Sequence, residues 1–245
     1  MKTKSLLITL VLVTALLLAS CDVQARVGAL RTESQSVELG DAKSVSVKIG
    51  FGAGDLKLTG GAQKLMQADF TYNVAKLKPV VEYTDATLVV KQPEVNGMPA
   101  LLGIGGFRNQ WGLQLYDGVP MDLSVDVGAG SGDLQLAGLS LTGLNITLGA
   151  GTYTVDLTGD WAHDLGIYIN AGAAILNVRL PKDVGARVTV ESGPHTIETT
   201  GLTKDGPVYT NAAYGVSGVT MQIDLVAGIG TINLDVEEAA AASGK

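Results

Sequence analysis

Few side chains in this sequence combine the types and spacing that catalysis requires. The only two histidines, His163 and His195, fall at different phases of the repeat described below, so we do not expect them to share a proton or a metal ion. No serine lies in the G-x-S-x-G pattern of a nucleophile elbow. The sole cysteine, Cys21, follows an apolar leader and is assigned below to a lipid. We therefore expect a protein that is not an enzyme and that holds neither a metal nor a cofactor.

Carboxylates offer the remaining route to chemistry. Asp126, Asp156 and Glu198 occupy outward phases, and a carbohydrate-active enzyme would need two such groups about 5–10 Å apart. Asp55 and Asp133 each follow a glycine, as in calcium-binding glycine-aspartate repeats, but those repeats carry aspartate throughout. Here aspartate fills that position in two of six copies, so we expect these two to be ordinary strand-start residues.

The stretch VDVGAGSGDLQLAG, residues 125–138, resembles a phosphate-binding loop until its repetition is noticed. Related segments begin at residues 125, 146, 167 and 188, always 21 apart, and two more begin at residues 47 and 223. A phosphate-binding loop would occur once in the sequence and would contain several glycines close together. A repeated backbone bend instead needs one glycine in every copy, because glycine reaches positive φ without a Cβ penalty. Aligned in this way, the six copies share one column of turn glycines: Gly52, Gly130, Gly151, Gly172, Gly193 and Gly228.

Apolar residues alternate with polar ones on both sides of each bend, which is typical of half-buried strands. In the second copy, Val125 and Val127 precede the bend, and Leu134 and Leu136 follow it. We predict an all-β fold, a right-handed parallel β-helix or β-solenoid with rungs of about 21 residues and an N-terminal strand and hairpin excursion. The alternative is an antiparallel β meander or sandwich, in which the bends are hairpins.

The excursions between repeats are where we expect specificity. The first excursion contains a strand-like alternation over residues 64–73 and a hairpin through residues 79–91. It continues into an aromatic segment that we interpret either as a candidate ligand patch or as a hydrophobic cap on the solenoid. The candidate patch consists of Phe107, Arg108, Asn109, Trp111 and Tyr116.

The N-terminus predicts export and lipid anchoring. A basic start, an uncharged run from Leu6 to Ala19 and the ending LASC describe a secretory signal peptide that resembles a bacterial lipobox. By that resemblance Cys21 carries a lipid, although cleavage nearby with a free thiol is the alternative. The expected organisation is a signal peptide at 1–20, lipidated cysteine and tether at 21–40, an N-terminal β region at 41–124, solenoid repeats at 125–236 and a flexible tail at 237–245.

The net charge of the protein limits the classes of partner that it can be expected to bind. Loss of residues 1–20 removes two lysines and no acid, leaving 17 − 2 = 15 basic and 24 acidic residues, a formal charge of −9. Such a balance argues against nucleic acid and against a basic membrane patch. We expect the lipid on Cys21 to be the link to the membrane, on its outer or periplasmic side, and an envelope protein or a glycan to be the partner.

Several motifs resemble the toast-rack family of bacterial envelope lipoproteins. They are GDLKLTGGAQKLMQADFTYN (54–73), KPVVEY (78–83), QWGLQL (110–115) and VPMDLSVDVGAG (119–130), and the resemblance covers about residues 44–236. Related β-solenoid domains occur in adhesin-like proteins and in regulators of the response to cell-wall-active antibiotics. The resemblance implies a non-enzymatic adhesion, scaffold or envelope-sensing module, with a small-ligand or carbohydrate-binding lipoprotein as the alternative.

Overall fold

The computed structural model of the protein describes residues 27–94, 106–193 and 195–237. Over these residues the chain forms strands and one short 3-10 helix, η1 (Ala75–Leu77), so the all-β prediction is confirmed. The first six strands are β1 (Arg31–Val37), β2 (Val45–Thr59), β3 (Met66–Tyr72), β4 (Val80–Thr84), β5 (Thr87–Lys91) and β6 (Asn109–Leu115). Eight follow: β7 (Met121–Gln135), β8 (Leu141–Asp156), β9 (Leu165–Pro181), β10 (Gly185–Ser192), β11 (His195–Thr200), β12 (Leu202–Asp205), β13 (Val208–Asn211) and β14 (Thr220–Glu237).

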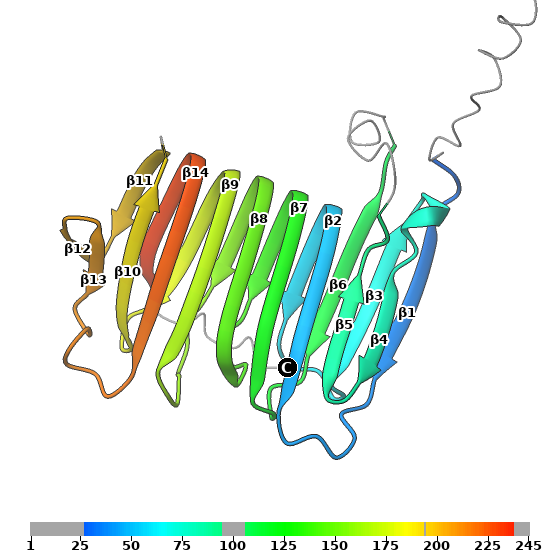
Figure 1. The fold of residues 1–245 in the computed structure, drawn as a ribbon, viewed down its shortest axis with the longest axis horizontal. Coiled ribbons are helices and arrows are strands. Elements are labelled where there is room, and N and C mark those ends of the chain that lie inside the picture. The colour runs from blue at the N-terminus through cyan, green and yellow to red at the C-terminus, as the bar shows by residue number, and fades with distance from the viewer. Residues whose placement is uncertain (1–26, 95–105, 194, 238–245) are drawn as a thin grey trace, which may run out of the picture.

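Five of these strands are long and bent, and they lie side by side in parallel as β2-β7-β8-β9-β14 (Figure 1). Antiparallel pairing in the described chain is confined to the two ends, where β1-β3-β6 and β4-β5 extend one end and β12-β13-β10 the other. The parallel solenoid-like prediction therefore describes the centre, and the meander alternative is wrong there. The strand and hairpin expected in the first excursion are β3 and β4–β5.

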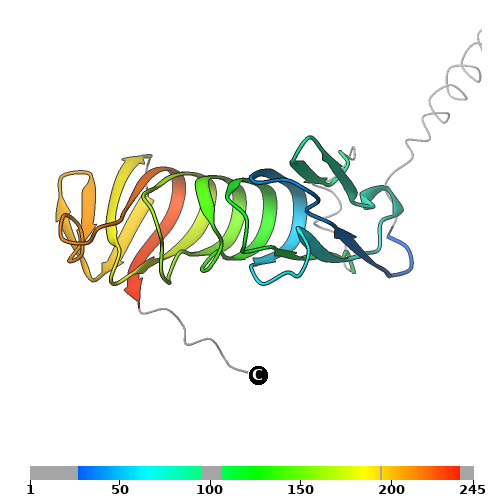
Figure 2. The same cartoon turned by 90° about the horizontal axis from the view of Figure 1, so that it is seen from below.

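Each long strand changes its alternation where it bends. In β2 the buried side chains alternate as Val45, Val47, Ile49, Phe51 and Ala53, and then as Leu56 and Leu58. Side chains of a straight strand point to opposite faces in turn, so the odd step from 53 to 56 shows that the phase flips at the bend. Because the strand also folds back, both halves turn their apolar side chains into one interior, which Figure 2 shows between two layers of ribbon.

Two rows of glycine make this bend possible. The first row consists of Gly52, Gly128, Gly149, Gly172, Gly228 and Gly193. The second consists of Gly54, Gly130, Gly151 and Gly230, with Ala174 in β9. The four glycines of the second row have φ between +126° and +153°, and a Cβ on any of them would lie 1.9–2.0 Å from a carbonyl oxygen of the adjacent strand. No side chain can occupy these four positions without moving the neighbouring backbone.

The register corrects the glycine column expected from the sequence. Gly130 pairs with Gly54 and Gly151 pairs with Gly130, so both belong to the second row and not with Gly52. The repeat length also varies: Val125 pairs with Ile146, 21 residues on, but Ile146 pairs with Ile169, 23 residues on. A shift of two residues preserves alternation in a strand, so the apolar pattern cannot distinguish the two registers. The alternating glycines of residues 128–132 make the shifted alignment look equally good.

The order of the last strands also differs from the expectation. Ile223 of β14 pairs with Ile167 of β9 on one side and Val188 of β10 on the other, so the final repeat lies between the third and the fourth (Figure 1). The outer edge of β10 is occupied by β13 of the β12–β13 hairpin. Because that edge is covered, β14 pairs along the inner edge, between β9 and β10.

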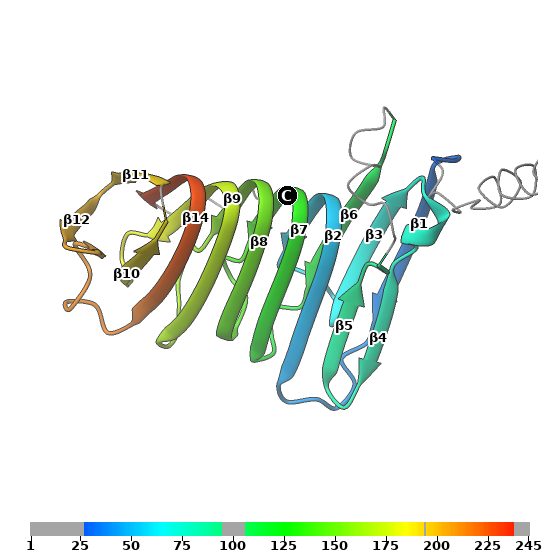
Figure 3. The same cartoon turned by 45° about the horizontal axis from the view of Figure 1, so that its top comes forward.

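The fold therefore presents two broad faces, one from each half of the bent strands. The first face contains the halves before the glycine rows, with β10, and is extended by the β4–β5 hairpin beside β2 (Figure 3) and by β12–β13. The second face contains the halves after the glycine rows, with β11, and is extended by β6, β3 and β1. Outward side chains of both faces line up in rows across the strands, at the roughly 4.8 Å spacing of paired strands.

One core position shows how closely adjacent strands of the second face pack. Gly132 pairs with Tyr153 on the buried side of the second face, where a Cβ on Gly132 would lie 2.9 Å from the tyrosine ring. Tyr153 is fully buried, and its hydroxyl donates to the Ala150 carbonyl at 3.1 Å. Burial raises the pKa of the Tyr153 hydroxyl. The missing side chain at residue 132 makes room for the largest side chain of the adjacent strand.

We predict that Gly130→Val destabilises the protein by more than about 3 kcal/mol, because positive φ alone costs a branched residue about 1–3 kcal/mol and the Cβ clash adds to it. Urea unfolding followed by circular dichroism measures the change. The control Gly112→Ala, at a strand glycine without positive φ and without a close neighbour, should not destabilise the protein and should raise its stability by up to about 1 kcal/mol. Equal unfolding midpoints for Gly130→Val and the wild type would contradict the role of the second glycine row.

Candidate functional site

Strand β6 places the residues of the predicted ligand patch mainly in the interior. Trp111 is 2% exposed and packs edge-on against Phe51 and Phe70, with ring centroids 4.9 and 5.1 Å away. Asn109 is 1% exposed, and its Nδ2 donates to the Ala53 carbonyl at 2.6 Å and to Gln92 Oε1 at 2.7 Å. Both side chains stabilise the end of the core where β6 meets β2.

The other three residues of that prediction lie apart. Phe107 packs against Val74 and Leu77, and Tyr116 is half-buried against the main core. The guanidinium Nη1 of Arg108 donates to the carbonyl of its neighbour Phe107 at 3.0 Å. The structure therefore does not gather the five side chains into one surface patch, and the ring of Trp111 lies where the hydrophobic-cap interpretation expects it.

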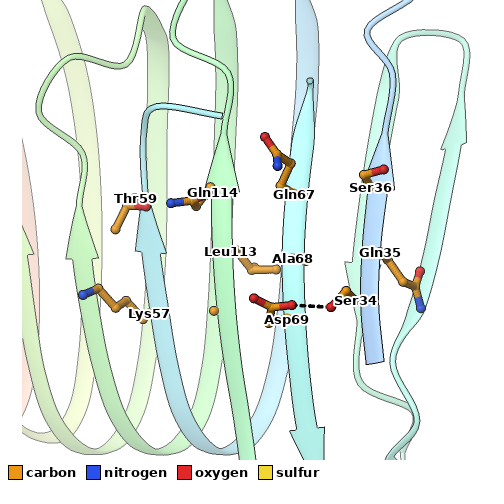
Figure 4. Close-up of a pocket in the computed structure, with 11 residues that line it drawn as sticks. Ser34, Gln35, Ser36, Lys57, Thr59, Gln67, Ala68, Asp69, Leu113 and Gln114 are labelled. Carbon is orange, nitrogen blue, oxygen red and sulfur yellow. Dashed lines mark hydrogen bonds between the residues drawn. The ribbon is translucent and has the colours of Figure 1, made fainter. Parts of the chain in front are cut away.

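The opposite side of β6 lines a groove on the second face. Alternation along the strand turns Gln110, Gly112 and Gln114 outward while Trp111 and Leu113 point inward. A hollow of about 540 Å³ lies over Gly112, and Figure 4 shows its polar rim from four strands: Ser34 and Ser36 of β1, Gln67 and Asp69 of β3, Gln114 of β6, and Lys57 and Thr59 of β2. We call this hollow the Gly112 groove. The alternation around Trp111 was the sequence signal that could have identified its outward residues.

Gly112 separates two opposite charges in one row. The row pairs Lys57 with Gly112, Gly112 with Asp69, and Asp69 with Ser34. Lys57 and Asp69 are therefore two strand spacings apart, roughly 10 Å, and Lys57 forms no ion pair within the described chain. Asp69 Oδ1 instead accepts a hydrogen bond from Ser34 Oγ at 2.5 Å, drawn as the dashed line in Figure 4. The groove thus combines a free ammonium group, a carboxylate, amides and hydroxyls.

The backbone does not require glycine at position 112. Its φ is not positive, and the nearest atom to an added Cβ would be the Asp69 carbonyl oxygen, 3.9 Å away. Glycine inside a strand is unfavourable by about 0.5–1 kcal/mol relative to alanine, and it often marks a place where a ligand or another chain approaches. At this position the missing side chain has one visible consequence, which is the open groove.

The groove continues toward the centre of the second face. An adjoining hollow of about 570 Å³ shares Lys57, Asp69 and Gly112 and extends over β7 and β8. Within it, Asp55 Oδ1 accepts from Ser131 Oγ at 2.7 Å and Asp55 Oδ2 accepts from Gln110 Nε2 at 3.2 Å. The whole surface offers donors and acceptors in regular rows, an arrangement suited to a long ligand rich in hydroxyl groups.

The outer wall of the groove is held by a charged contact on the reverse side of β1. Tyr72 donates its hydroxyl hydrogen to Glu33 Oε1 at 2.5 Å, and Lys78 Nζ lies 2.9 Å from Glu33 Oε2. The hydrogen bond from Tyr72, followed by that from Lys78, lowers the pKa of Glu33. Burial, reinforced by the carboxylate of Glu33, raises the pKa of Tyr72. This contact fixes β1 against β3, so Ser34 and Ser36 stay at the groove.

Asp55 and Asp133 line the same hollow from the adjacent strands β2 and β7. The three acids considered for glycoside hydrolysis do not converge, and neither do the two histidines. Asp126 lies on the first face, whereas Asp156 and Glu198 lie on the second, three strand spacings and two residues apart across β9 and β14, which is roughly 16 Å. His163 Nε2 contacts the Leu141 carbonyl at 2.9 Å near the connectors, and His195 Nδ1 contacts the Gly193 carbonyl at 2.7 Å near the bends. In the part of the chain that the structure describes, no group of three or more His, Cys, Asp or Glu residues is placed to hold a metal ion.

Parallel strands that bend at stacked glycines around one core, with polar rows on both faces, define a β-solenoid-like class of protein. Within that class, the chain belongs to the toast-rack family: the pattern described as the N-terminal domain of toast_rack, DUF2154, matches residues 26–179. No curated protein matches the chain. Within residues 27–94, 106–193 and 195–237, no helix has the length and apolar composition that a membrane crossing requires.

Solved structures extend the comparison. The protein is similar to a "putative cell adhesion protein" from Clostridium sporogenes ATCC 15579, at 27% identity and a TM-score of 0.81, over 85% of this chain and all of that one. It also matches a "putative adhesin" from Bacteroides fragilis NCTC 9343 over 84% of this chain and 97% of that one, at 10% identity and a TM-score of 0.37.

We predict that the stability supplied by Glu33 is lost in acid. A carboxyl group whose pKa is lowered by folding stabilises the protein above its unfolded pKa, and this contribution disappears as the pH falls through the lowered folded value. Urea titrations of the wild type and of Glu33→Gln at pH 7 and pH 3 test this. The wild type should be the more stable protein at pH 7, and the difference should be smaller at pH 3, because the contribution is lost as the pH falls from the unfolded pKa of about 4.3 through the lowered folded pKa. A difference that is the same at both pH values would rule out this role of the carboxylate.

Proposed function

We propose that this protein is a non-enzymatic adhesion module of the bacterial envelope, anchored to the membrane by a lipid on Cys21, whose Gly112 groove binds a hydroxyl-rich polymer such as an envelope glycan. One observation carries the proposal: a row of polar side chains is interrupted by a glycine that the backbone does not need, and the groove is open at that point. The likeness to the cell adhesion protein from Clostridium sporogenes supports the adhesive role.

The chemistry of the groove favours a neutral, hydroxyl-bearing partner. Its amides and hydroxyls can each donate and accept, as sugar hydroxyls do, and its two charges are of opposite sign. A nucleic acid would need many cations along its phosphates, and this chain has a formal charge of −7 before processing. A scaffold or envelope-sensing role would use the same surface and the same anchor.

A binding role is also supported by the positions of the acids. Glycoside hydrolysis uses two carboxyl groups about 5–10 Å apart on either side of the scissile bond. Asp156 and Glu198 are separated by two intervening strands, and Asp126 lies on the other face. In the groove, Asp69 is held by Ser34, and its companion across Gly112 is a lysine.

Filling the groove should weaken polymer binding. We predict that Gly112→Gln lowers the affinity of the detergent-purified full-length protein for protein-free bacterial cell-wall glycan by at least about tenfold, or ~1.4 kcal/mol, because the new side chain occupies the groove. Co-sedimentation with the glycan measures the affinity. The matched control is Gly218→Gln, at another glycine with open space around it and no positive φ, which should bind like the wild type. Undiminished binding by Gly112→Gln would show that the polymer lies elsewhere.

The lipid anchor has its own test. Residues 1–26, which include Cys21, lie outside the described residues, so the anchor is a prediction from the lipobox-like ending alone. Cys21→Ala should abolish incorporation of labelled palmitate and release the processed protein from the membrane fraction, whereas Gly112→Gln should retain both. Full palmitate labelling of Cys21→Ala would contradict the anchor.

A further inference from the structure

A second hollow lies on the first face, on the other side of the molecule from the Gly112 groove. Its volume is about 480 Å³, and it spans the beginnings of β8, β9 and β14. Tyr168 stands in one row with Asn145 of β8 and Asp224 of β14, and Gln222 of β14 pairs with Gly166 of β9 in the row beside it. We call this hollow the Tyr168 site.

Two glycines form its floor. Around Gly166 an added Cβ would meet no atom within 4 Å, and its φ is not positive, so neither space nor backbone conformation requires glycine there. At Gly143 the close neighbour of an added Cβ is Asp122 Oδ1, the mobile end of a side chain. As at Gly112, a strand position that would accept a side chain carries none, and a hollow results.

The walls combine an exposed ring with unused polar groups. Tyr168 is 41% exposed, although aromatic side chains usually bury most of their surface. The side chains of Asn145, Gln222 and Asp224 make no hydrogen bond within the described chain. Asp164 at the rim uses Oδ1 to accept from the Thr220 backbone N–H at 2.8 Å, which leaves its second oxygen to face the hollow's edge.

We propose that the Tyr168 site binds a pyranose ring of a neutral saccharide. The apolar face of a sugar can stack on the exposed tyrosine ring, while its hydroxyls, each both donor and acceptor, match the amides of Asn145 and Gln222 and the carboxylate of Asp224. The hollow is of the size of small-ligand sites. The lining of the hollow contains carboxylates but no lysine or arginine, so it repels the negative charge of phosphate-bearing and acidic sugars.

This site is independent of the Gly112 groove, because the two hollows lie on opposite faces and share no residue. If both bind glycans, one molecule holds two chains on its two sides. An adhesion module with two such faces can bridge two polymers and gain avidity from the second contact.

The test uses the detergent-purified full-length protein and saturation-transfer NMR with three neutral trisaccharides, chitotriose, cellotriose and mannotriose, together with the acidic sialyllactose. At least one neutral trisaccharide should bind more tightly than sialyllactose. Tyr168→Ala, which removes the stacking surface, and Gly166→Leu, which fills the floor, should each weaken that binding at least tenfold. Thermal unfolding verifies that both variants fold, as the exposed positions predict.

Matched controls separate this site from other surfaces. Tyr214→Ala removes another tyrosine of 40% exposure, outside the hollow, and should bind like the wild type. The same trisaccharide comparisons made in a Gly112→Gln background measure the Tyr168 site with the Gly112 groove filled, so that either proposal can fail without the other. The inference is overturned if no neutral trisaccharide binds, if sialyllactose binds more tightly, or if binding survives both Tyr168→Ala and Gly166→Leu.

Discussion

Two stacked rows of glycine at the strand bends are the constraint on which this fold depends. In the second row, four glycines with positive φ place their backbones so close to the neighbouring carbonyl oxygens that no Cβ fits. This close stacking lets each long strand fold back while it stays paired with its neighbours on both halves. The phase flip at the same point turns both halves toward one core, so a single strand contributes to two faces.

The surface follows from the same geometry. Once the core side of each half is set, every second residue must point outward, and paired strands bring these residues into rows. A glycine in such a row leaves a hollow between its neighbours, as Gly112 does between Lys57 and Asp69, and Gly166 does beside Tyr168. Glycines of two kinds therefore coexist: those at the bends are required by the backbone, and those at the hollows are not.

Sequence patterns predicted the local structure well and the long-range arrangement less well. The bends and the β4–β5 hairpin follow from alternation and glycine spacing, whereas these patterns allowed either parallel central strands or a meander, of which the structure shows the parallel arrangement. The two-residue shift between β8 and β9 could not be predicted, since a slip of two keeps every side chain on its own face. The insertion of β14 beside β9 depends on which edges remain open in three dimensions. The candidate patch of residues 107–116 includes strand β6, but its Trp111 and Asn109 are buried in the structure. The groove on the other side of β6 results from the missing side chain of Gly112, which no chemical pattern in the sequence indicates.

The register across the bend is tested most directly by disulfide formation between β8 and β9 in a Cys21→Ser background. Thr147 pairs with Asn170, and paired strands bring Cα atoms to roughly 4.8 Å, within the range that a disulfide spans. The 21-residue alignment would instead pair Thr147 with Tyr168, which here lies diagonally, at roughly 8 Å. The account predicts that Thr147→Cys with Asn170→Cys crosslinks under mild oxidation and that Thr147→Cys with Tyr168→Cys does not. The reverse result would contradict the stacked glycine rows.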